Sequence, residues 1–122
     1  MIKIKEATVE TIIESARNVY PNEFIALLGV TGKEGVIDEL VMVPATYGRN
    51  YSSIKTWLVP FDRSIVGSIH SHPSVGNSPS KGDLRAFAKF GDVHFIISYP
   101  YNLESLRVFN VRGTELEFEV VD

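Results

Sequence analysis

Cysteine is absent from this sequence of 122 residues. Without cysteine the chain forms no disulfide bond, offers no thiolate nucleophile and holds no zinc ion or iron–sulfur cluster through sulfur. The cysteine-containing zinc signature of nucleobase deaminases is excluded for the same reason. A transition metal bound here must therefore take its protein ligands mainly from histidine, aspartate and glutamate.

Long hydrophobic runs and basic clusters are missing as well. No apolar segment approaches the roughly 20 residues that a membrane-spanning helix requires, so we expect no membrane partner. Twelve Lys and Arg stand against fifteen Asp and Glu, a net charge of −3, and this balance argues against nucleic acid as the main partner. The N-terminus has no signal-peptide core, and the hydrophobic fraction of 44% is ordinary for a globular protein. We therefore expect one cytoplasmic domain spanning residues 1–122.

The first half of the chain has the pattern of extended segments around one helix. Residues 1–5 alternate in polarity and predict a short strand. Apolar residues then recur at helical spacing over residues 8–20, with Thr8 as the expected N-cap. Residues 24–30 are continuously apolar, which indicates a buried strand, and residues 36–43 predict its partner in a hairpin.

The second half combines a loop rich in turn residues at 44–54 with further strands and one more helix. Leu84 and Phe87 mark a short helix that ends near Gly91. We expect strands at residues 56–59, 65–72, 93–99, 106–111 and 116–121, the last two forming a hairpin. This order of elements predicts an α/β (α+β) fold with a mixed sheet and a helix at two points in the chain.

The most informative stretch is a His-x-His-Pro sequence at the end of one expected strand. His70 and His72 are two residues apart, and alternate residues of a strand point to the same face. Both imidazoles can therefore reach one ion, at about 2.0–2.1 Å each for zinc. Pro73 ends the strand, so the pair lies at a strand end, where functional sites are commonly built.

Asp83 supports two interpretations. It lies in the first turn of the expected helix, and ten residues separate it from His72, a loop long enough to fold back and bring a carboxylate to the imidazoles. Two histidines and one carboxylate leave the fourth position of a zinc ion open for water. Alternatively, Ser80 and Asp83 form a variant capping box at the start of the helix, and taken alone this is the commoner use of that spacing.

A hydrolytic metal site also needs a general base, and Glu23 is the candidate. It opens the apolar segment 24–30, where partial burial would tune its pKa for proton transfer. On residue pattern alone, a solvated glutamate in the connection between helix and strand is the stronger interpretation, because nothing local ties Glu23 to His70. The Ser80 hydroxyl also has two uses, since it could stabilise an oxyanion or cap the helix.

Six residues, taken in their order and spacing along the chain, make up one motif: Glu23, His70, His72, Pro73, Ser80 and Asp83. An upstream Glu, then His-x-His-Pro, then Ser-x-x-Asp resembles the motif of the JAMM (MPN-plus) metalloproteases. The resemblance covers nearly the whole chain and is greatest to the short, stand-alone archaeal members. One departure is Ala26, since many members have glycine three residues after the Glu.

The resemblance implies a fold and a chemistry. The fold is a curved, mixed and mostly antiparallel β-sheet packed with helices, related to that of cytidine deaminases. His70, His72 and Asp83 would hold one Zn²⁺ per chain, with water in the open position. Glu23 would deprotonate this water as the general base, and Ser80 would stabilise the oxyanion. Members of this type cleave isopeptide bonds after the C-terminal glycine of ubiquitin or ubiquitin-like modifiers, so the implied substrates are ubiquitin-like protein conjugates.

The sequence leaves other functions open. The chain could be a non-catalytic MPN-type interaction module, or a peptidase that acts on sulfur-carrier proteins or small peptides. His94 could complete a three-histidine metal site, although we favour a structural role for it within its strand. Tyr47, Tyr51 and Trp57 could line a groove for an extended modifier tail, although we favour ordinary partial burial at the margin of the sheet for them. The two terminal strands could leave an exposed edge that pairs the chain into a homodimer.

Overall fold

Helices interrupt a series of strands in the part of the chain that the structure describes. The computed structural model describes residues 1–42, 64–74, 76 and 78–122. In chain order the elements are β1 (Ile2–Lys5), α1 (Glu6–Val19), β2 (Ile25–Gly29), β3 (Glu39–Val41), β4 (Ile65–His72), α2 (Lys81–Phe87), β5 (Val93–Ser98), the 3-10 helix η3 (Leu103–Ser105), β6 (Leu106–Phe109), β7 (Glu115–Leu116) and β8 (Phe118–Val121).

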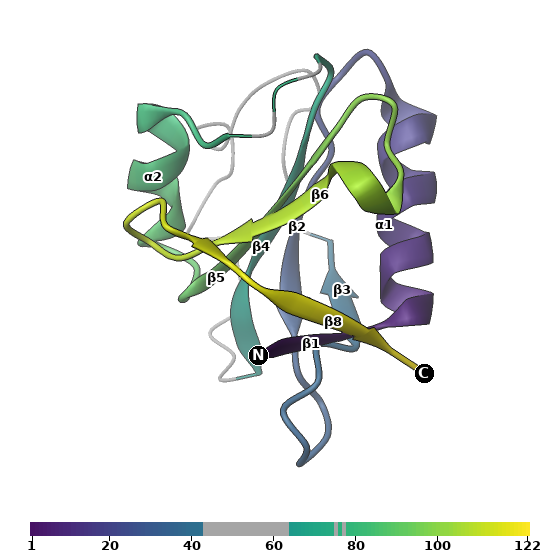
Figure 1. Ribbon diagram of the computed structural model, residues 1–122, viewed down its shortest axis with the longest axis vertical. Helices are drawn as coiled ribbons and strands as arrows, with labels where there is room; N and C mark the ends of the chain where they lie inside the picture. The colour runs from purple at the N-terminus through teal and green to yellow at the C-terminus, as the bar shows by residue number, and fades with distance from the viewer. Residues whose placement is uncertain (43–63, 75, 77) are drawn as a thin grey trace.

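Six of the strands form one sheet in the order β3-β2-β4-β5-β6-β7. The β4–β5 pair is parallel, and the other neighbouring pairs are antiparallel. β1 and β8 form a separate parallel pair, which crosses the lower part of the view in Figure 1. The mixed, mostly antiparallel sheet predicted for this α+β fold is therefore confirmed.

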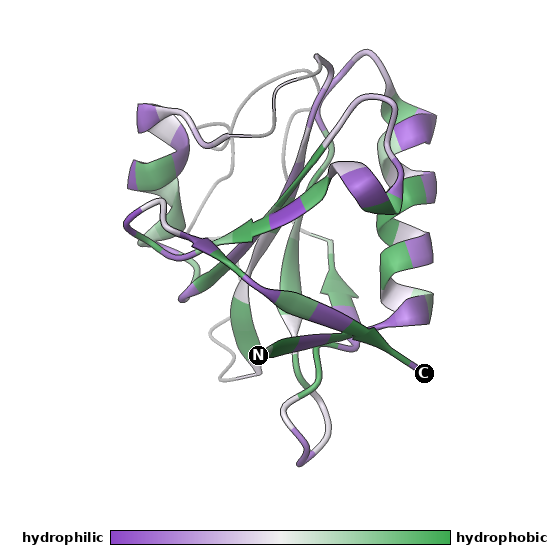
Figure 2. Ribbon diagram, viewed as in Figure 1, coloured by the Kyte–Doolittle hydropathy of each residue, from purple (hydrophilic) through white to green (hydrophobic). Residues whose placement is uncertain are grey.

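The sheet lies between the two α-helices, with α1 on one side and α2 on the other (Figure 1). Alternate residues of β2 separate two cores. Ala26 and Leu28 join the cluster that includes α1, whereas Ile25 and Leu27 join the cluster that includes α2. Figure 2 shows β2 in hydrophobic colours and α1 in bands, as expected for a helix with one buried stripe. Neither α-helix of the described chain has the length and apolarity of a membrane span.

Most of the elements predicted from hydrophobic periodicity are present. The segments expected at 1–5, 8–20, 24–30 and 93–99 are β1, α1, β2 and β5, and β4 has the predicted bounds. Among the described residues of the strand expected at 36–43, the three residues of β3 form the strand. The loop at 44–54, the strand at 56–59 and the aromatic residues proposed to line a groove lie outside the described residues: Tyr47, Tyr51 and Trp57.

The N-cap predicted at Thr8 is wrong. α1 begins at Glu6, and Lys5 occupies the N-cap position without a side-chain cap. The Lys5 N–H donates to the Ile37 carbonyl oxygen at 2.8 Å, and this bond keeps β1 extended up to the first helical residue. Thr8 instead lies inside α1 and is 6% exposed.

The hairpin predicted between residues 106–111 and 116–121 is correct at its turn and wrong beyond it. β6 pairs antiparallel with the short β7, around a turn in which Gly113 has φ of 83°. The chain then leaves the six-stranded sheet, and β8 pairs in parallel with β1. Phe118 and Val120 pack against the core cluster that includes α1, so the burial of these side chains draws β8 away from β6.

The parallel packing of β4 on β5 requires glycine at position 67. A Cβ atom at Gly67 would lie 1.5 Å from the Val93 carbonyl oxygen, which belongs to the backbone of β5. Gly67→Ala should therefore lower the free energy of unfolding by about 3 kcal/mol or more, measured by urea denaturation. Gly32→Ala is the control, since a Cβ there meets nothing within 4 Å. Equal stability of the two variants would contradict the β4–β5 register.

Candidate metal centre

His70 and His72 lie at the carboxyl end of β4, on the face of the sheet that α2 covers. His70 is 1% exposed, and its ring centroid is 6.2 Å from that of Phe87 in α2. The Nε2 atoms of the two histidines are 2.9 Å apart. The alternation expected of a strand therefore holds, and it brings both imidazoles together with their Nε2 atoms facing.

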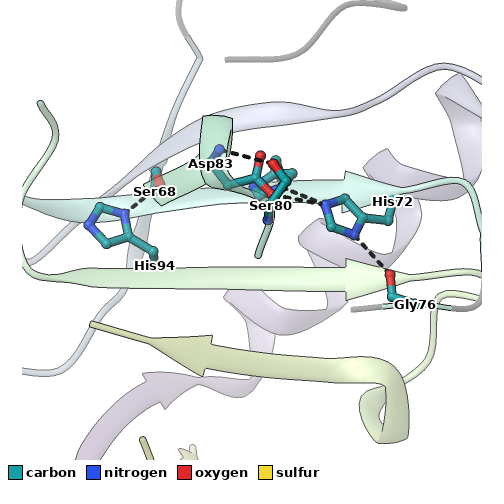
Figure 3. A network of polar contacts seen from close by, with 7 residues as sticks. Ser68, His72, Gly76, Ser80, Asp83 and His94 are labelled. Atoms are coloured by element: carbon teal, nitrogen blue, oxygen red, sulfur yellow. Dashed lines mark hydrogen bonds and ion pairs between the residues drawn. The ribbon is translucent and has the colours of Figure 1, made fainter. Parts of the chain in front are cut away.

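Asp83 reaches the two imidazoles from the first turn of α2. Its Oδ2 atom lies 3.4 Å from Nε2 of both His70 and His72. The same oxygen accepts a hydrogen bond from the Ser80 N–H at 2.9 Å, and the Asp83 N–H donates to Ser80 Oγ at 3.1 Å. The predicted capping box is confirmed, and it holds the carboxylate where the metal-ligand interpretation requires it (Figure 3).

The three donor atoms have the chemistry and the spacing of a zinc site. Donors at 2.0–2.1 Å from a tetrahedral zinc ion are about 3.3 Å apart. The separations here are 2.9 Å between the two nitrogens and 3.4 Å from each nitrogen to the oxygen. Two imidazoles and one carboxylate are the donor set of catalytic zinc sites that keep one position open. The group formed by His70, His72 and Asp83 therefore fits a single Zn²⁺.

The outer nitrogen of His72 is fixed by the backbone. His72 Nδ1 lies 2.8 Å from the Gly76 carbonyl oxygen (Figure 3). A carbonyl oxygen only accepts, so Nδ1 carries the proton and the neutral ring has its lone pair on Nε2. Bonds of this kind orient metal-binding histidines. Sequence reasoning missed Gly76, because a backbone carbonyl in a loop has no signature in residue type.

Burial and proximity shift the pKa values of the three groups. Burial lowers the pKa of His70, so this ring is held neutral. Burial also opposes charge on His72, but the nearby Asp83 carboxylate and the hydrogen bond to the Gly76 carbonyl outweigh it and raise the His72 pKa. Burial opposes charge on Asp83 too, yet the two imidazoles that face its carboxylate hold its pKa well below the usual range. The centre is thus a buried anion facing two nitrogen donors.

Glu23 lies beside this centre because of how β2 pairs with β4. Ile25 is paired with His70, and continuing this antiparallel register places Glu23 opposite His72. Burial raises the pKa of Glu23, and its charge interacts with His72 and Asp83. The structure therefore brings the proposed base to the candidate ligands, although nothing in the local sequence indicates this link.

His94 is buried with both ring nitrogens bonded inside the fold. Its Nε2 lies 2.7 Å from the Gly91 carbonyl oxygen and its Nδ1 lies 2.8 Å from Ser68 Oγ. The ring also stacks on Phe87, with centroids 4.1 Å apart and an interplanar angle of 4°. Figure 3 shows His94 and Ser68 apart from the Asp83 carboxylate. These contacts confirm the structural role predicted for His94, and the group of described residues that could hold a metal ion consists of His70, His72 and Asp83.

Comparisons with known proteins agree with the geometry of the centre. Residues 5–109 match the family of prokaryotic homologues of the JAB domain. The whole chain aligns at 32% identity with 81% of a protein from Haloferax volcanii named "probable metalloprotease". A JAB1/MPN domain protein from Archaeoglobus fulgidus is 38% identical with a TM-score of 0.80, over 99% of this chain and 100% of that one. A structure described as "JAMM: a metalloprotease-like zinc site in the proteasome and signalosome" is 37% identical with a TM-score of 0.79, over 100% of this chain and 99% of that one.

Asp83→Asn should separate the two roles of this side chain. An asparagine oxygen can still accept from the Ser80 N–H and keep the cap, but it lacks the charge of a zinc ligand. Zinc measured after dialysis should be about one ion per chain in the unmodified protein and roughly a tenth of that or less in the variant. Asp92→Asn, at an exposed position, is the control and should keep its zinc. Full zinc content in Asp83→Asn would contradict its assignment as a ligand.

The buried, neutral His94 should make the fold sensitive to acid. Burial lowers the pKa of His94 to about 4 from the ordinary 6.5, so below pH 6.5 the unfolded chain takes up a proton that the folded chain does not. The free energy of unfolding is therefore unaffected by protonation of this histidine above pH 6.5, and it falls by about 3 kcal/mol as the pH is lowered to 4. Urea denaturation of zinc-free protein should show this loss, and His94→Gln should lack it. An equal loss in both proteins would contradict the burial of a neutral ring.

Proposed function

Since the chain belongs to the family of prokaryotic JAB-domain homologues, we propose that it is a zinc isopeptidase acting on ubiquitin-like protein conjugates. The bond cleaved is the one after the C-terminal glycine of the modifier. The observation that carries this proposal is the meeting of His70, His72 and Asp83 with Glu23 beside them. In this proposal residues 1–122 form one domain with one Zn²⁺, and the domain works as a metalloprotease of the JAMM type.

His70, His72 and Asp83 act as the metal ligands. A zinc ion held by them would supply the Lewis acidity that lowers the pKa of water and polarises a carbonyl group. Each of the three donors is held in place by a contact within the protein. His70 is packed against α2, His72 is bonded to the Gly76 carbonyl, and Asp83 is held by the capping box.

Glu23 acts as the general base. Burial raises the pKa of Glu23. A pKa closer to the working pH makes the carboxylate a better proton acceptor. The carboxylate removes a proton from the attacking water and later delivers it to the nitrogen of the leaving amine. For a conjugate this nitrogen belongs to the amino group that carried the modifier.

Ser80 acts on the carbonyl oxygen of the scissile bond. It is exposed at the N-cap of α2, next to Asp83. Its Oγ atom accepts the hydrogen bond from the Asp83 N–H, so its own proton is not used in that bond. This proton is available to the oxyanion that develops when water adds to the carbonyl.

A glycine-terminated tail suits this arrangement as the acyl group. The carbonyl must come within reach of Ser80 and of the three ligands at the same time. A glycine brings no side chain to this point, so its carbonyl can approach without displacing the surrounding groups. This chain carries the complete Glu-His-His-Ser-Asp set of the JAMM metalloproteases that it resembles. That resemblance also supports ubiquitin-like conjugates as the substrate class.

Glu23→Gln should abolish hydrolysis and leave the metal in place. The amide cannot accept the proton from water, so kcat should fall by roughly 10²-fold or more. The assay uses a fluorogenic aminocoumarin amide with a Gly-Gly acyl group, and a ubiquitin-like protein joined through Gly-Gly to a lysine side chain. Zinc content should remain at about one ion per chain, because Glu23 is outside the ligand set.

Glu34→Gln is the matched control for this experiment. It makes the same chemical change at an exposed residue between β2 and β3, at the end of β2 remote from the histidines. Its kcat should equal that of the unmodified protein. Undiminished cleavage by Glu23→Gln with zinc retained would contradict the role of the base and favour another mechanism. Cleavage of ordinary peptides but not of the Gly-Gly probes would contradict the substrate class.

A further inference from the structure

Ser71 lies between the two histidines and points to the opposite face of the sheet. Alternation along β4 directs His70 and His72 toward α2 and Ser71 toward α1. Ser71 is 0% exposed, so its hydroxyl is a buried polar group that needs a partner within the fold. Its side chain is therefore outside the ligand face, and its hydroxyl bonds to a group on the other face of the sheet.

The partner of the Ser71 hydroxyl is the backbone of Phe24. The Phe24 N–H donates to Ser71 Oγ at 2.7 Å, and the Ser71 N–H donates to the Phe24 carbonyl oxygen at 2.9 Å. One residue of β4 thus binds both backbone polar groups of a residue 47 positions away in the chain. These two bonds close the β2–β4 pairing at the end where the histidines lie.

Phe24 in turn determines where Glu23 lies. The Phe24 side chain is 1% exposed within the core cluster that includes α1, so its ring and its backbone are both held. The Phe24 N–H belongs to the planar peptide group that also contains the Cα atom of Glu23. The hydrogen bond from this N–H to Ser71 Oγ therefore orients the peptide plane from which the Glu23 side chain projects.

We propose that Ser71 is a positioning residue, which holds Glu23 beside His72 through the peptide group between Glu23 and Phe24. This inference rests on the proposed function of Glu23 as the general base. The strand that carries two metal ligands on one face would then support the base from the other. A displacement of about 1 Å at a reacting group can cost on the order of 10²-fold in rate, so a single buried hydroxyl here is sufficient to affect catalysis.

Three variants separate positioning from simple stabilisation of the fold. Ser71→Ala removes the acceptor of the Phe24 N–H, and Ser71→Thr keeps it on a side chain that suits a strand. Ser68→Ala is the matched control. Ser68 is also 0% exposed on β4, but its hydroxyl bonds to His94 and not to Phe24. Both alanine variants lose a buried hydroxyl from the same strand, so a difference between them reports on the Phe24 contact.

Amide hydrogen exchange is the first readout, because it needs no substrate. In the zinc-loaded protein, the Phe24 amide should exchange roughly tenfold faster or more in Ser71→Ala. Exchange at this amide should stay near that of the unmodified protein in Ser71→Thr and Ser68→Ala. Zinc content should remain at about one ion per chain in all three variants. Unchanged exchange at Phe24 in Ser71→Ala would overturn the inference, whatever the activity.

Hydrolysis of the Gly-Gly aminocoumarin amide is the second readout. Ser71→Ala should lower kcat roughly tenfold or more with KM within about twofold, and Ser71→Thr should restore most of the loss. Ser68→Ala should retain the kcat of the unmodified protein. Equal kcat in the two alanine variants would overturn the inference and leave the proposed function intact. Full activity in Glu23→Gln would instead contradict the proposed function. The result for Glu23→Gln does not depend on the Ser71 variants, so the two failures are distinguishable.

Discussion

The burial of one carboxylate, that of Asp83, is the constraint on which the rest of the centre depends. Asp83 is 6% exposed and still has a pKa well below the usual range, so its charge must be compensated inside the fold. The Ser80 N–H supplies one hydrogen bond at 2.9 Å. The two imidazole nitrogens lie at 3.4 Å, which is longer than a good N–H···O bond. A divalent cation bound between the two imidazole nitrogens and the Asp83 carboxylate would compensate this negative charge. Its geometry would be better than that of a proton shared between an imidazole and the carboxylate.

The β4-α2-β5 crossover brings this carboxylate to the histidines. β4 and β5 are parallel neighbours, so the chain must return along the sheet between them, and it does so through α2. The helix therefore begins near the carboxyl end of β4, where His70 and His72 lie. Asp83, in the first turn of α2, has its carboxylate 3.4 Å from both imidazoles. The same crossover places α2 over the histidine face, and α1 remains to cover the face that carries Phe24.

Local patterns predicted the parts of the centre that come from one stretch of chain. Alternation over β4 predicts the common face of His70 and His72, and the Ser-x-x-Asp spacing predicts the cap. The place of Glu23 could not be predicted from residue patterns, since it depends on the antiparallel register between two distant strands. The errors at Thr8 and in the last hairpin have a similar origin. The backbone bond of Lys5 to a neighbouring segment and the burial of the β8 side chains outweighed local preferences.

One zinc ion should bind where β4 meets the first turn of α2. A crystal structure of the zinc-loaded protein, with anomalous diffraction at the zinc edge, would locate this ion and its ligands. We expect one ion within about 2.0–2.2 Å of His70 Nε2, His72 Nε2 and Asp83 Oδ2, with the Glu23 carboxylate facing the open position. An ion bound by His94, or no ion at these three ligands in saturating zinc, would show that His70, His72 and Asp83 do not form the metal centre.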